Sequence, residues 1–324
     1  MTPRRDRAAP DLRGVGAPTA TRSRASADAS PSLAPGVDGA LATGPAPAPR
    51  SNAAGVPERP VGERFEVMGC VGVRYGRGPR TMVGLHGWSG SRESFVPLLP
   101  HLPPQFSFYA FDLPGSGESA GFEAWSEAAV LERLEQVFDA LGLRRIELLG
   151  VCGGMGFGSR LAARRPDTFS RLVLVDPFAY VPWYLALFTW PMLGAFFYWW
   201  TFANPLGRWL TNGALSGRRS RDTSLTDGFR RVRHRDNRGQ LCALAESARH
   251  DLVELGRFEG PVDIVYGERT FAAVRRSCDL LLRPYPRARR HLVAGAGHLP
   301  MHEAPEELAR IAFSRGAEPE GARR

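Results

Sequence analysis

The sequence contains no lysine, so all 42 of its basic residues are arginine, and its formal net charge is +9. Clustered positive charge attracts nucleic acid and anionic membranes. A coding bias toward arginine gives the same count without any such partner. Because the chain has neither a nucleic-acid-binding motif nor a basic stripe interleaved with aromatic residues, we expect no nucleic-acid partner.

Cysteine is also scarce. The four cysteines are scattered without a CxxC pair or metal-ligand spacing, and no dinucleotide-binding glycine fingerprint is present. We therefore expect neither a metal ion nor a cofactor. The N-terminal charges are not followed by the apolar stretch of about 7 to 15 residues that marks a secretory signal. Together these features predict a reducing, cytoplasmic compartment.

Residues 1–60 lack aromatic side chains and any apolar periodicity. They consist mainly of Ala, Pro, Gly, Ser and Arg, a composition that cannot bury enough apolar surface to offset the entropy of ordering. We predict a disordered tail over 1–60 and a flexible C-terminus over 319–324. The tail holds eight Arg against five acidic residues, too weak an excess for a nucleic-acid-binding arm.

From Arg64 onward, short apolar runs alternate with amphipathic stretches. The clearest helix covers 123–143, where apolar residues recur at helical spacing up to Gly142. Alternation of buried strands with helices predicts a mostly parallel sheet with helices on both faces. Because this pattern stops near residue 179 and resumes near 259, we predict a core of 61–178 and 259–318 with an insertion of 179–258.

The stretch "GVCGG" follows a predicted strand and precedes a predicted helix. Gly150, Cys152 and Gly154 form the pattern of a nucleophile elbow with cysteine in the serine position, and the glycines allow the tight turn. A helix N-terminus favours the thiolate, which is the reactive form of the side chain. The alternative is that Cys152 is a small buried residue on an ordinary turn.

Three further motifs accompany the elbow, in the order "LHGWSGSRESF" (85–95), "FDLPGSGES" (111–119) and, after the elbow, "GAGHLPMHEAPEELA" (295–309). With these motifs the chain resembles the α/β-hydrolase superfamily over about residues 64–315. The resemblance implies an α/β-hydrolase fold, in which the insertion forms a cap over the site.

The resemblance also implies roles for individual residues. Cys152 would be the nucleophile and His298 the general base and then acid. The backbone N–H groups of Trp88 and Gly153 would form an oxyanion hole. His86 and His302 would be structural.

The triad acid departs from the family pattern. Many members carry Asp three residues after the glycine that follows the penultimate strand, but this position is Thr270 in "YGERT". Asp176, after the preceding strand, is one alternative, although a strand-end Asp also serves as a turn cap. Glu268 is another. A third alternative is that the site has no acid, because a thiol nucleophile ionises more easily than an alcohol.

The insertion combines an apolar segment with a basic one. Residues 181–205 carry no charge and are rich in Trp, Tyr and Phe, but Pro191 argues against a membrane crossing. An apolar cap predicts a small hydrophobic acyl substrate. Residues 218–238 carry a net charge of +5. This cluster fits peripheral docking on an anionic bilayer, an acidic head group such as a carrier phosphate, or a solvated surface.

The leading functional hypothesis is a hydrolase of a hydrophobic ester, thioester or lactone that acts through an acyl-cysteine intermediate. An acyltransferase using the same Cys-His site is one alternative. A non-catalytic relative that binds a lipid or a protein partner is another.

Overall fold

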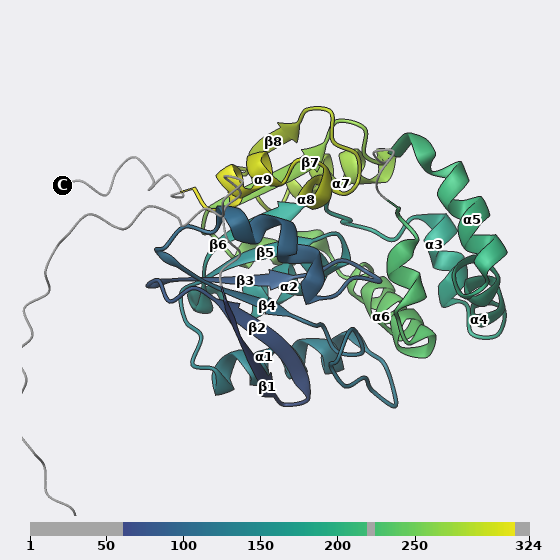
Figure 1. Cartoon of the computed structure of the whole chain (residues 1–324), viewed down its shortest axis with the longest axis horizontal. Coiled ribbons are helices and arrows are strands. Elements are labelled where there is room, and N and C mark those ends of the chain that lie inside the picture. Colours follow the sequence, from purple (N-terminus) through teal and green to yellow (C-terminus); the bar gives the residue numbers. More distant parts are fainter. Residues whose placement is uncertain (1–60, 219–223, 315–324) are drawn as a thin grey trace, which may run out of the picture. The chain divides into compact units, whose positions relative to one another are not determined.

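The computed structural model describes residues 61–218 and 224–314. The tail expected over 1–60 and the C-terminus expected over 319–324 lie outside the described residues. An eight-stranded sheet organises the described part, in the order β1-β2-β4-β3-β5-β6-β7-β8 (Figure 1). The strands are β1 (Gly62–Val67), β2 (Cys70–Tyr75), β3 (Arg80–Leu85), β4 (Phe106–Phe111), β5 (Ile146–Val151), β6 (Phe169–Val175), β7 (Val262–Gly267) and β8 (Arg289–Val293).

The sheet is mostly parallel. Only the β1–β2 hairpin and the β2–β4 pair are antiparallel, whereas the five pairs from β4 to β8 are parallel. A parallel strand covered on both faces needs apolar side chains at successive positions, and all six residues of β5 are buried. The predicted fold class, a mostly parallel α/β sheet flanked by helices, is therefore confirmed.

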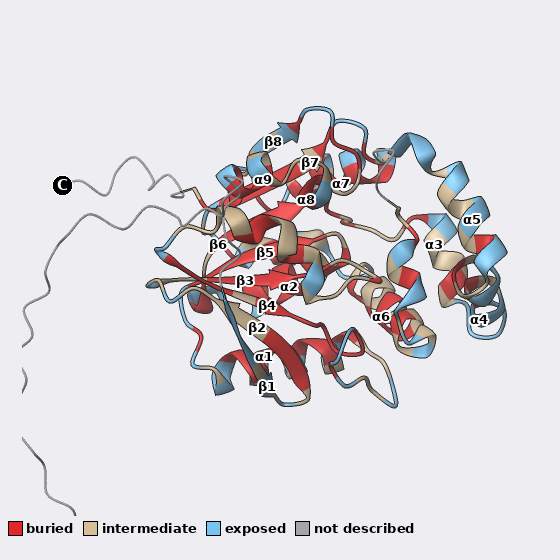
Figure 2. Cartoon of the chain, viewed as in Figure 1, coloured by how far each residue is buried: buried red, intermediate tan, exposed pale blue. Residues whose placement is uncertain are grey.

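Helices cover both faces of the sheet (Figure 2). One apolar core lies under α1 (Glu127–Ala140), α2 (Gly153–Arg164) and α7 (Ala272–Leu281). The other lies under η1 (Arg92–His101), α8 (Pro300–Glu303) and α9 (Pro305–Ala312). A short 3₁₀ turn, η2 (Pro166–Thr168), connects α2 to β6.

Local sequence signals set the ends of the predicted elements. Helix α1 begins after Ser126, whose Oγ accepts a hydrogen bond from the Ala129 N–H, and ends before Gly142, which has φ = 64°. Segment η1 is a 3₁₀ helix. Pro97 and Pro100 lie inside it, and each removes a backbone donor that an α-helix would use.

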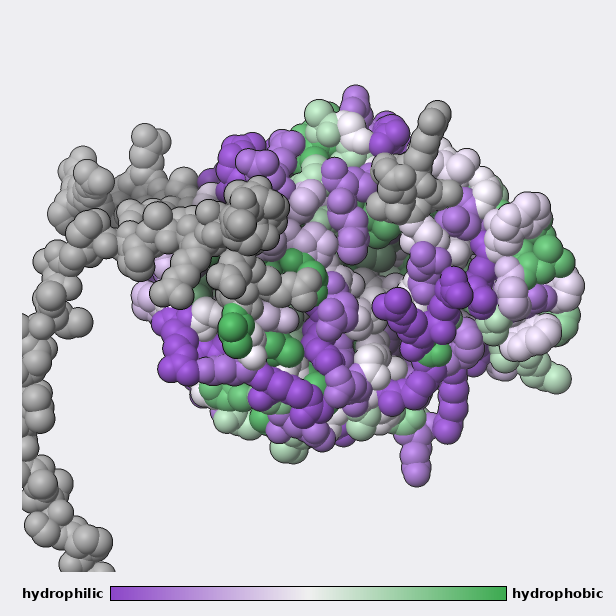
Figure 3. All heavy atoms as spheres, viewed as in Figure 1, coloured by the Kyte–Doolittle hydropathy of each residue, from purple (hydrophilic) through white to green (hydrophobic). Residues whose placement is uncertain are grey.

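The predicted insertion corresponds to the chain between β6 and β7, and the regular elements of its described residues are all helical. They are α3 (Trp183–Ala186), η3 (Leu187–Thr189), α4 (Leu193–Tyr198), η4 (Trp199–Ala203), α5 (Pro205–Ala214), η5 (Ser216–Arg218), η6 (Asp227–Arg230), α6 (His234–Ser247) and η7 (Leu252–Arg257). Figure 3 shows pale and green residues gathered at the outer end of this region, over α4 and α5. No helix within the described ranges has both the length and the apolar character to cross a bilayer.

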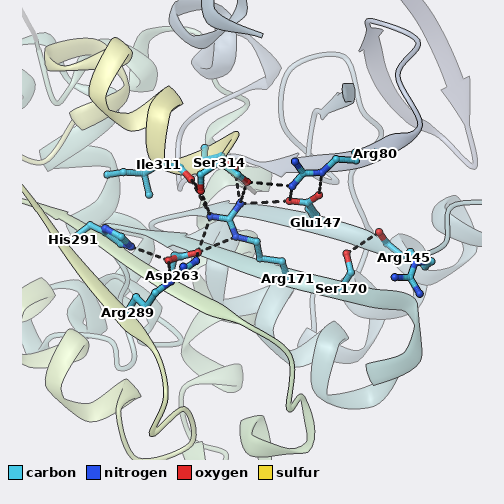
Figure 4. Close-up of polar contacts among 11 residues, drawn as sticks. Arg80, Arg145, Glu147, Ser170, Arg171, Asp263, Arg289, His291, Ile311 and Ser314 are labelled. Carbon is cyan, nitrogen blue, oxygen red and sulfur yellow. Dashed lines mark hydrogen bonds and ion pairs between the residues drawn. The ribbon is translucent and has the colours of Figure 1, made fainter. Parts of the chain in front are cut away.

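A buried ion cluster lies at the amino ends of the parallel strands (Figure 4). Asp263 of β7 is fully buried and accepts hydrogen bonds from Arg171 of β6 at 2.7 and 2.9 Å. It also accepts two bonds from Arg289, at 2.8 and 2.9 Å, and lies 2.8 Å from His291 Nε2. Burial acts to raise the pKa of Asp263, but Arg289, Arg171 and His291 outweigh it and lower the pKa.

The same cluster extends to β5 and to the end of the described chain. Arg80 forms a two-pronged ion pair with Glu147, at 2.7 and 2.9 Å. Arg171 donates to the backbone oxygens of Ile311, Ala312 and Ser314, at 2.8 to 3.1 Å. The cluster therefore joins the sheet to the C-terminal end of α9.

Candidate active site

Cys152 occupies a strained turn between β5 and α2. It is the residue before the first helical position and has φ = 47° and ψ = −117°, a conformation that L-residues rarely adopt. Glycine is required on both sides because a Cβ on Gly150 would lie 2.7 Å from Met155 Cα, and one on Gly154 would lie 2.3 Å from Leu85 O. The predicted elbow is thus present in the backbone and lifts the Cys152 side chain out of the sheet.

Three predicted side chains meet at the carboxyl edge of the sheet. Cys152 follows β5, Asp176 follows β6, and His298 lies beyond β8. His298 Nδ1 lies 2.8 Å from Asp176 Oδ2, and the Cys152 side chain is close enough to the same imidazole to raise its pKa. The carboxylate, imidazole and thiol therefore lie together at this edge.

The imidazole of His298 is held in its protonated form. Burial alone would lower its pKa, but the hydrogen bonds to Asp176 and Cys152, with their negative charge, raise the pKa to about 10. The rings of Phe271 and Phe178 pack edge-on against the imidazole, with ring centroids 4.7 and 5.7 Å away, and shield it from water.

The structure distinguishes the alternatives for the acid. Asp176 is fully buried, and its Oδ1 accepts a hydrogen bond from Gly267 N at 3.0 Å, while Oδ2 faces His298. Thr270 donates to the same Oδ2 at 2.9 Å, so it supports the carboxylate and does not replace it. Glu268 is exposed and accepts a hydrogen bond from Gly295 N instead. Among the described residues, Asp176 and not Glu268 is therefore the carboxylate in contact with His298.

Two backbone N–H groups border the space beside Cys152. A Cβ on Gly153 would lie 3.5 Å from Trp88 N, so the backbone of Trp88 lies close to the residue that follows Cys152. Neither amide has a hydrogen-bond partner among residues 61–218 and 224–314. Two free N–H donors beside a nucleophile can stabilise the negative charge that develops on a substrate carbonyl oxygen.

The predicted structural histidines lie outside this constellation. His86 is fully buried, with Nδ1 2.8 Å from Gly87 O, and its Nε2 accepts a hydrogen bond from Leu113 N at 3.0 Å. Burial lowers the pKa of His86, so the neutral ring joins two loops at the carboxyl edge. His302 is exposed on α8.

Asn237 is a site residue that sequence reasoning missed. It lies on α6, is almost fully buried, and accepts hydrogen bonds from Trp88 Nε1 through its backbone oxygen (2.7 Å) and from Ser89 N through Oδ1 (3.1 Å). Its Nδ2 donates to Tyr198 OH at 2.9 Å. Asn237 therefore ties the cap to the loop that carries the Trp88 amide. The sequence showed it only as one polar residue within an arginine-rich stretch.

An apolar cavity of about 70 Å³ lies beside Cys152. This volume is several times the roughly 10–15 Å³ that one water molecule needs, so a small organic group fits. The segment between β6 and β7 supplies much of the wall through Pro182 and Leu185 near α3, and through Leu241 and Leu244 of α6. The lining favours an apolar group attached to the reacting carbon. Within the described part of the chain, no group of three or more His, Cys, Asp or Glu side chains is placed to hold a metal ion.

Comparison with known proteins gives a family and a set of relatives. Residues 80–305 match a family model described as the alpha/beta hydrolase fold. A segment of 95 residues, 29% of the chain, is 34% identical to the pimeloyl-[acyl-carrier protein] methyl ester esterase of Neisseria meningitidis serogroup B. It covers 35% of that protein, so the match spans about a third of the relative's length.

A longer match extends over most of the chain. Over 246 residues the chain is 26% identical to the pimeloyl-[acyl-carrier protein] methyl ester esterase of Yersinia pseudotuberculosis serotype O:1b, and this match covers 73% of the chain and 93% of the relative. Among solved structures, the enol-lactonase from Burkholderia xenovorans LB400 superposes with a TM-score of 0.62 at 18% identity, over 77% of this chain and 97% of that one. At that identity the superposition establishes the fold alone.

Proposed function

Because the chain belongs to the α/β-hydrolase fold family, we propose that it hydrolyses an ester, thioester or lactone with an apolar acyl group through an acyl-cysteine on Cys152. The observation that carries this proposal is the grouping of Asp176, His298 and Cys152, beside two backbone amides that have no partner within the described residues. The esterase names of the curated relatives support the choice of ester chemistry.

In the first half-reaction the Cys152 thiolate attacks the carbonyl carbon and forms a C–S bond, and the carbonyl oxygen becomes an oxyanion. The N–H groups of Trp88 and Gly153 donate hydrogen bonds to this oxyanion. When the tetrahedral intermediate collapses, the bond to the leaving alcohol or thiol breaks. The leaving group takes the proton that His298 holds, and the acyl group stays on Cys152.

In the second half-reaction water attacks the thioester carbonyl. His298, now neutral, takes a proton from this water, and the same two amides stabilise the second oxyanion. Collapse releases the carboxylic acid and returns the thiolate with the protonated imidazole. Asp176 keeps the ring oriented through Nδ1 and favours its positive form in both halves.

Turnover of p-nitrophenyl esters and of acyl thioesters from two to twelve carbons tests this proposal. We expect activity in the wild type and a loss of at least about 10⁴-fold in kcat for Cys152→Ala, since the nucleophile is removed. Cys242→Ala is the matched control because Cys242 is also partly buried, on α6, and lies outside the constellation.

The outcomes separate the alternatives. Hydrolysis that depends on Cys152 but not on Cys242 supports the proposal. Product formation only when an alcohol or amine acceptor is added indicates acyl transfer by the same site. Absence of turnover and of acylation over the whole panel overturns both and favours a non-catalytic binding protein.

A further inference from the structure

The cap carries a concentrated exposed apolar surface. Eleven of the fifteen exposed large hydrophobic side chains in the described chain lie between residues 183 and 210. Five of them are tryptophans, at 183, 190, 199, 200 and 209. Single exposed apolar residues are ordinary, whereas a contiguous patch marks an interaction surface. We call the exposed apolar side chains of α3, α4, η4 and α5, with those of the turn between η3 and α4, the cap face.

On helix α5 the exposed apolar side chains follow the helical spacing of the sequence. Leu206, Trp209 and Leu210 are spaced to lie on one helical stripe, and their exposed fractions are 54%, 71% and 52%. The polar side chains turn to the protein instead: Arg208 donates to the backbone oxygens of Phe202 and Ala203, and Asn212 Oδ1 accepts from Leu225 N. The helix is amphipathic with its apolar stripe toward solvent, the reverse of an ordinary surface helix.

Exposed positive charge lies on the segment that packs against η4. Phe229 of η6 stacks on Phe202 of η4 with ring centroids 4.1 Å apart, and Arg230 and Arg231 follow Phe229 directly in the chain. Both arginines are exposed, and neither forms an ion pair or side-chain hydrogen bond with another described residue. Residues 177–207 contain no charged side chain at all. Figure 3 shows the apolar end of the cap with hydrophilic residues between it and the sheet.

We propose that the cap face docks the protein on an anionic lipid surface, with the apolar side chains at the level of the acyl-chain boundary and Arg230 and Arg231 at the phosphates. Tryptophan favours this interface because its ring is apolar and its N–H is polar. Short helices broken at Pro182, Pro191 and Pro205 lie in the plane of a membrane and do not cross it. Arginine and an acidic lipid head group supply the charge complementarity.

The cap face is continuous with the wall of the cavity. Leu185 of α3 lines the cavity beside Cys152, while Trp183 in the same short helix is 76% exposed. Docking would therefore bring the cavity close to the lipid, from which an apolar acyl substrate enters. The entry of substrate from the lipid rests on the proposed function, but the docking itself does not. Cys152→Ala, which lacks the proposed nucleophile, must therefore bind lipid as the wild type does.

Co-sedimentation of the full chain with vesicles tests the docking. One set of vesicles contains phosphatidylcholine with phosphatidylglycerol, and the other contains phosphatidylcholine alone. We expect binding to the anionic vesicles that weakens with salt, and a blue shift of tryptophan emission on binding. Trp209→Ser/Leu210→Ser should bind about tenfold more weakly or worse, because two apolar contacts are lost.

Matched pairs of substitutions control for surface apolarity and net charge. Val253→Ser/Leu292→Ser removes two exposed apolar residues elsewhere and should leave binding unchanged. Arg230→Glu/Arg231→Glu should weaken binding to anionic vesicles by about tenfold or more, and Arg283→Glu/Arg287→Glu, with the same charge change at other exposed positions, should have a much smaller effect. Far-ultraviolet circular dichroism of each variant verifies folding.

Three outcomes overturn the proposal. The first is no binding to either kind of vesicle. The second is equal loss of binding in the cap-face and control pairs. The third is a stable dimer in solution that Trp209→Ser/Leu210→Ser converts to monomer without any vesicle binding, which would assign the cap face to a second copy of the chain.

Discussion

Polar side chains cluster at both ends of the parallel strands β5 to β8. The two clusters differ in how many of their hydrogen-bonding groups have a partner. At the amino ends, Asp263 accepts from two arginines and contacts a histidine, and Arg171 donates to carboxylate and backbone oxygens (Figure 4). At the carboxyl ends, Cys152 sits at positive φ and the amides of Trp88 and Gly153 have no partner within the described residues.

This difference separates a structural cluster from a reactive one. Both clusters contain a fully buried aspartate within hydrogen-bond distance of a basic side chain. At the amino ends each charged side chain of the cluster meets one of opposite charge, and although Arg80 Nη1 has no partner within the described residues, these ion pairs stabilise the fold. At the carboxyl ends, strain and unused donors remain beside an apolar cavity, and such groups gain their partners only when a substrate is bound.

Among the substitutions, Cys152→Gly is expected to give the largest difference between its effect on activity and its effect on stability. Activity should fall by at least about 10⁴-fold because the nucleophile is lost. The free energy of unfolding should rise by about 1 kcal/mol, since glycine adopts this backbone conformation without strain. Steady-state kinetics and urea denaturation measure the two effects. A variant that loses both activity and stability would show that the elbow is held for structural reasons.

Asp263→Asn should have the opposite effect: stability should fall while activity is kept. It leaves the buried Arg171 charge without its carboxylate, so we expect the free energy of unfolding to fall by about 3–5 kcal/mol. The kcat of the folded fraction should stay within about twofold of wild type, because the cluster does not touch the site. Urea denaturation and kinetics under fully folded conditions check this. A large kcat loss in a folded variant would contradict the separation of the two ends.

Asp176→Asn should lower kcat by about 10²-fold, less than the roughly 10⁴-fold seen for a serine nucleophile, because a thiol is easier to ionise. The raised pKa of His298 means that its ring is protonated at pH values below about 10 and loses its proton, and its role as acid, as pH rises through that value. Asp176→Asn removes a hydrogen bond that raises this pKa. The alkaline limit of activity should therefore move to lower pH, as a pH profile of kcat/KM will record.

The double variant Asp176→Asn/Thr270→Asp refines this test. Thr270 Oγ1 lies 3.4 Å from His298 Nδ1, so a carboxylate at position 270 is within reach of the ring. We expect it to recover about tenfold or more of the activity lost in Asp176→Asn. Thr270→Asp alone would place two carboxylates together and serves as the comparison. Failure of the double variant to recover any activity would mean that position 270 cannot orient the imidazole.

Asn237→Ala is expected to have the smallest effect, a loss of about tenfold in kcat with little change in KM. The substitution removes the side-chain contacts to Ser89 N and Tyr198 OH, so the loop bearing the Trp88 amide is positioned less well. Kinetics with one ester substrate separate kcat from KM. Recovery in Asn237→Asp, which keeps the Oδ1 acceptor, would support positioning through Ser89. A change in KM alone would indicate that the cap only shapes the cavity.

Much of the fold could be predicted because the sequence signals are local. Apolar runs gave the parallel strands, Gly142 marked the end of α1, and the glycines around Cys152 marked the elbow. The start of α1 was predicted four residues too early, because the cap at Ser126 was not recognised. The 3₁₀ form of η1 was missed, since the effect of its two prolines depends on which donors remain available.

The site was predicted less completely because its contacts are non-local. The approach of Asp176 to His298 joins the ends of β6 and β8 across 122 positions, and nothing in either local sequence separates it from the Glu268 alternative. Asn237 acts through α6, whose position over the Trp88 loop is fixed by tertiary packing. The direction in which the apolar stripe of α5 faces is likewise a tertiary property.

The most direct test of the central claim is mass spectrometry of the protein quenched in acid during turnover of a medium-chain acyl ester. We predict a mass increase equal to the acyl group less one hydrogen, located on the peptide that contains Cys152 and absent from Cys152→Ala. Turnover without this adduct, with the acyl group on another residue, or undiminished in Cys152→Ala would contradict the account.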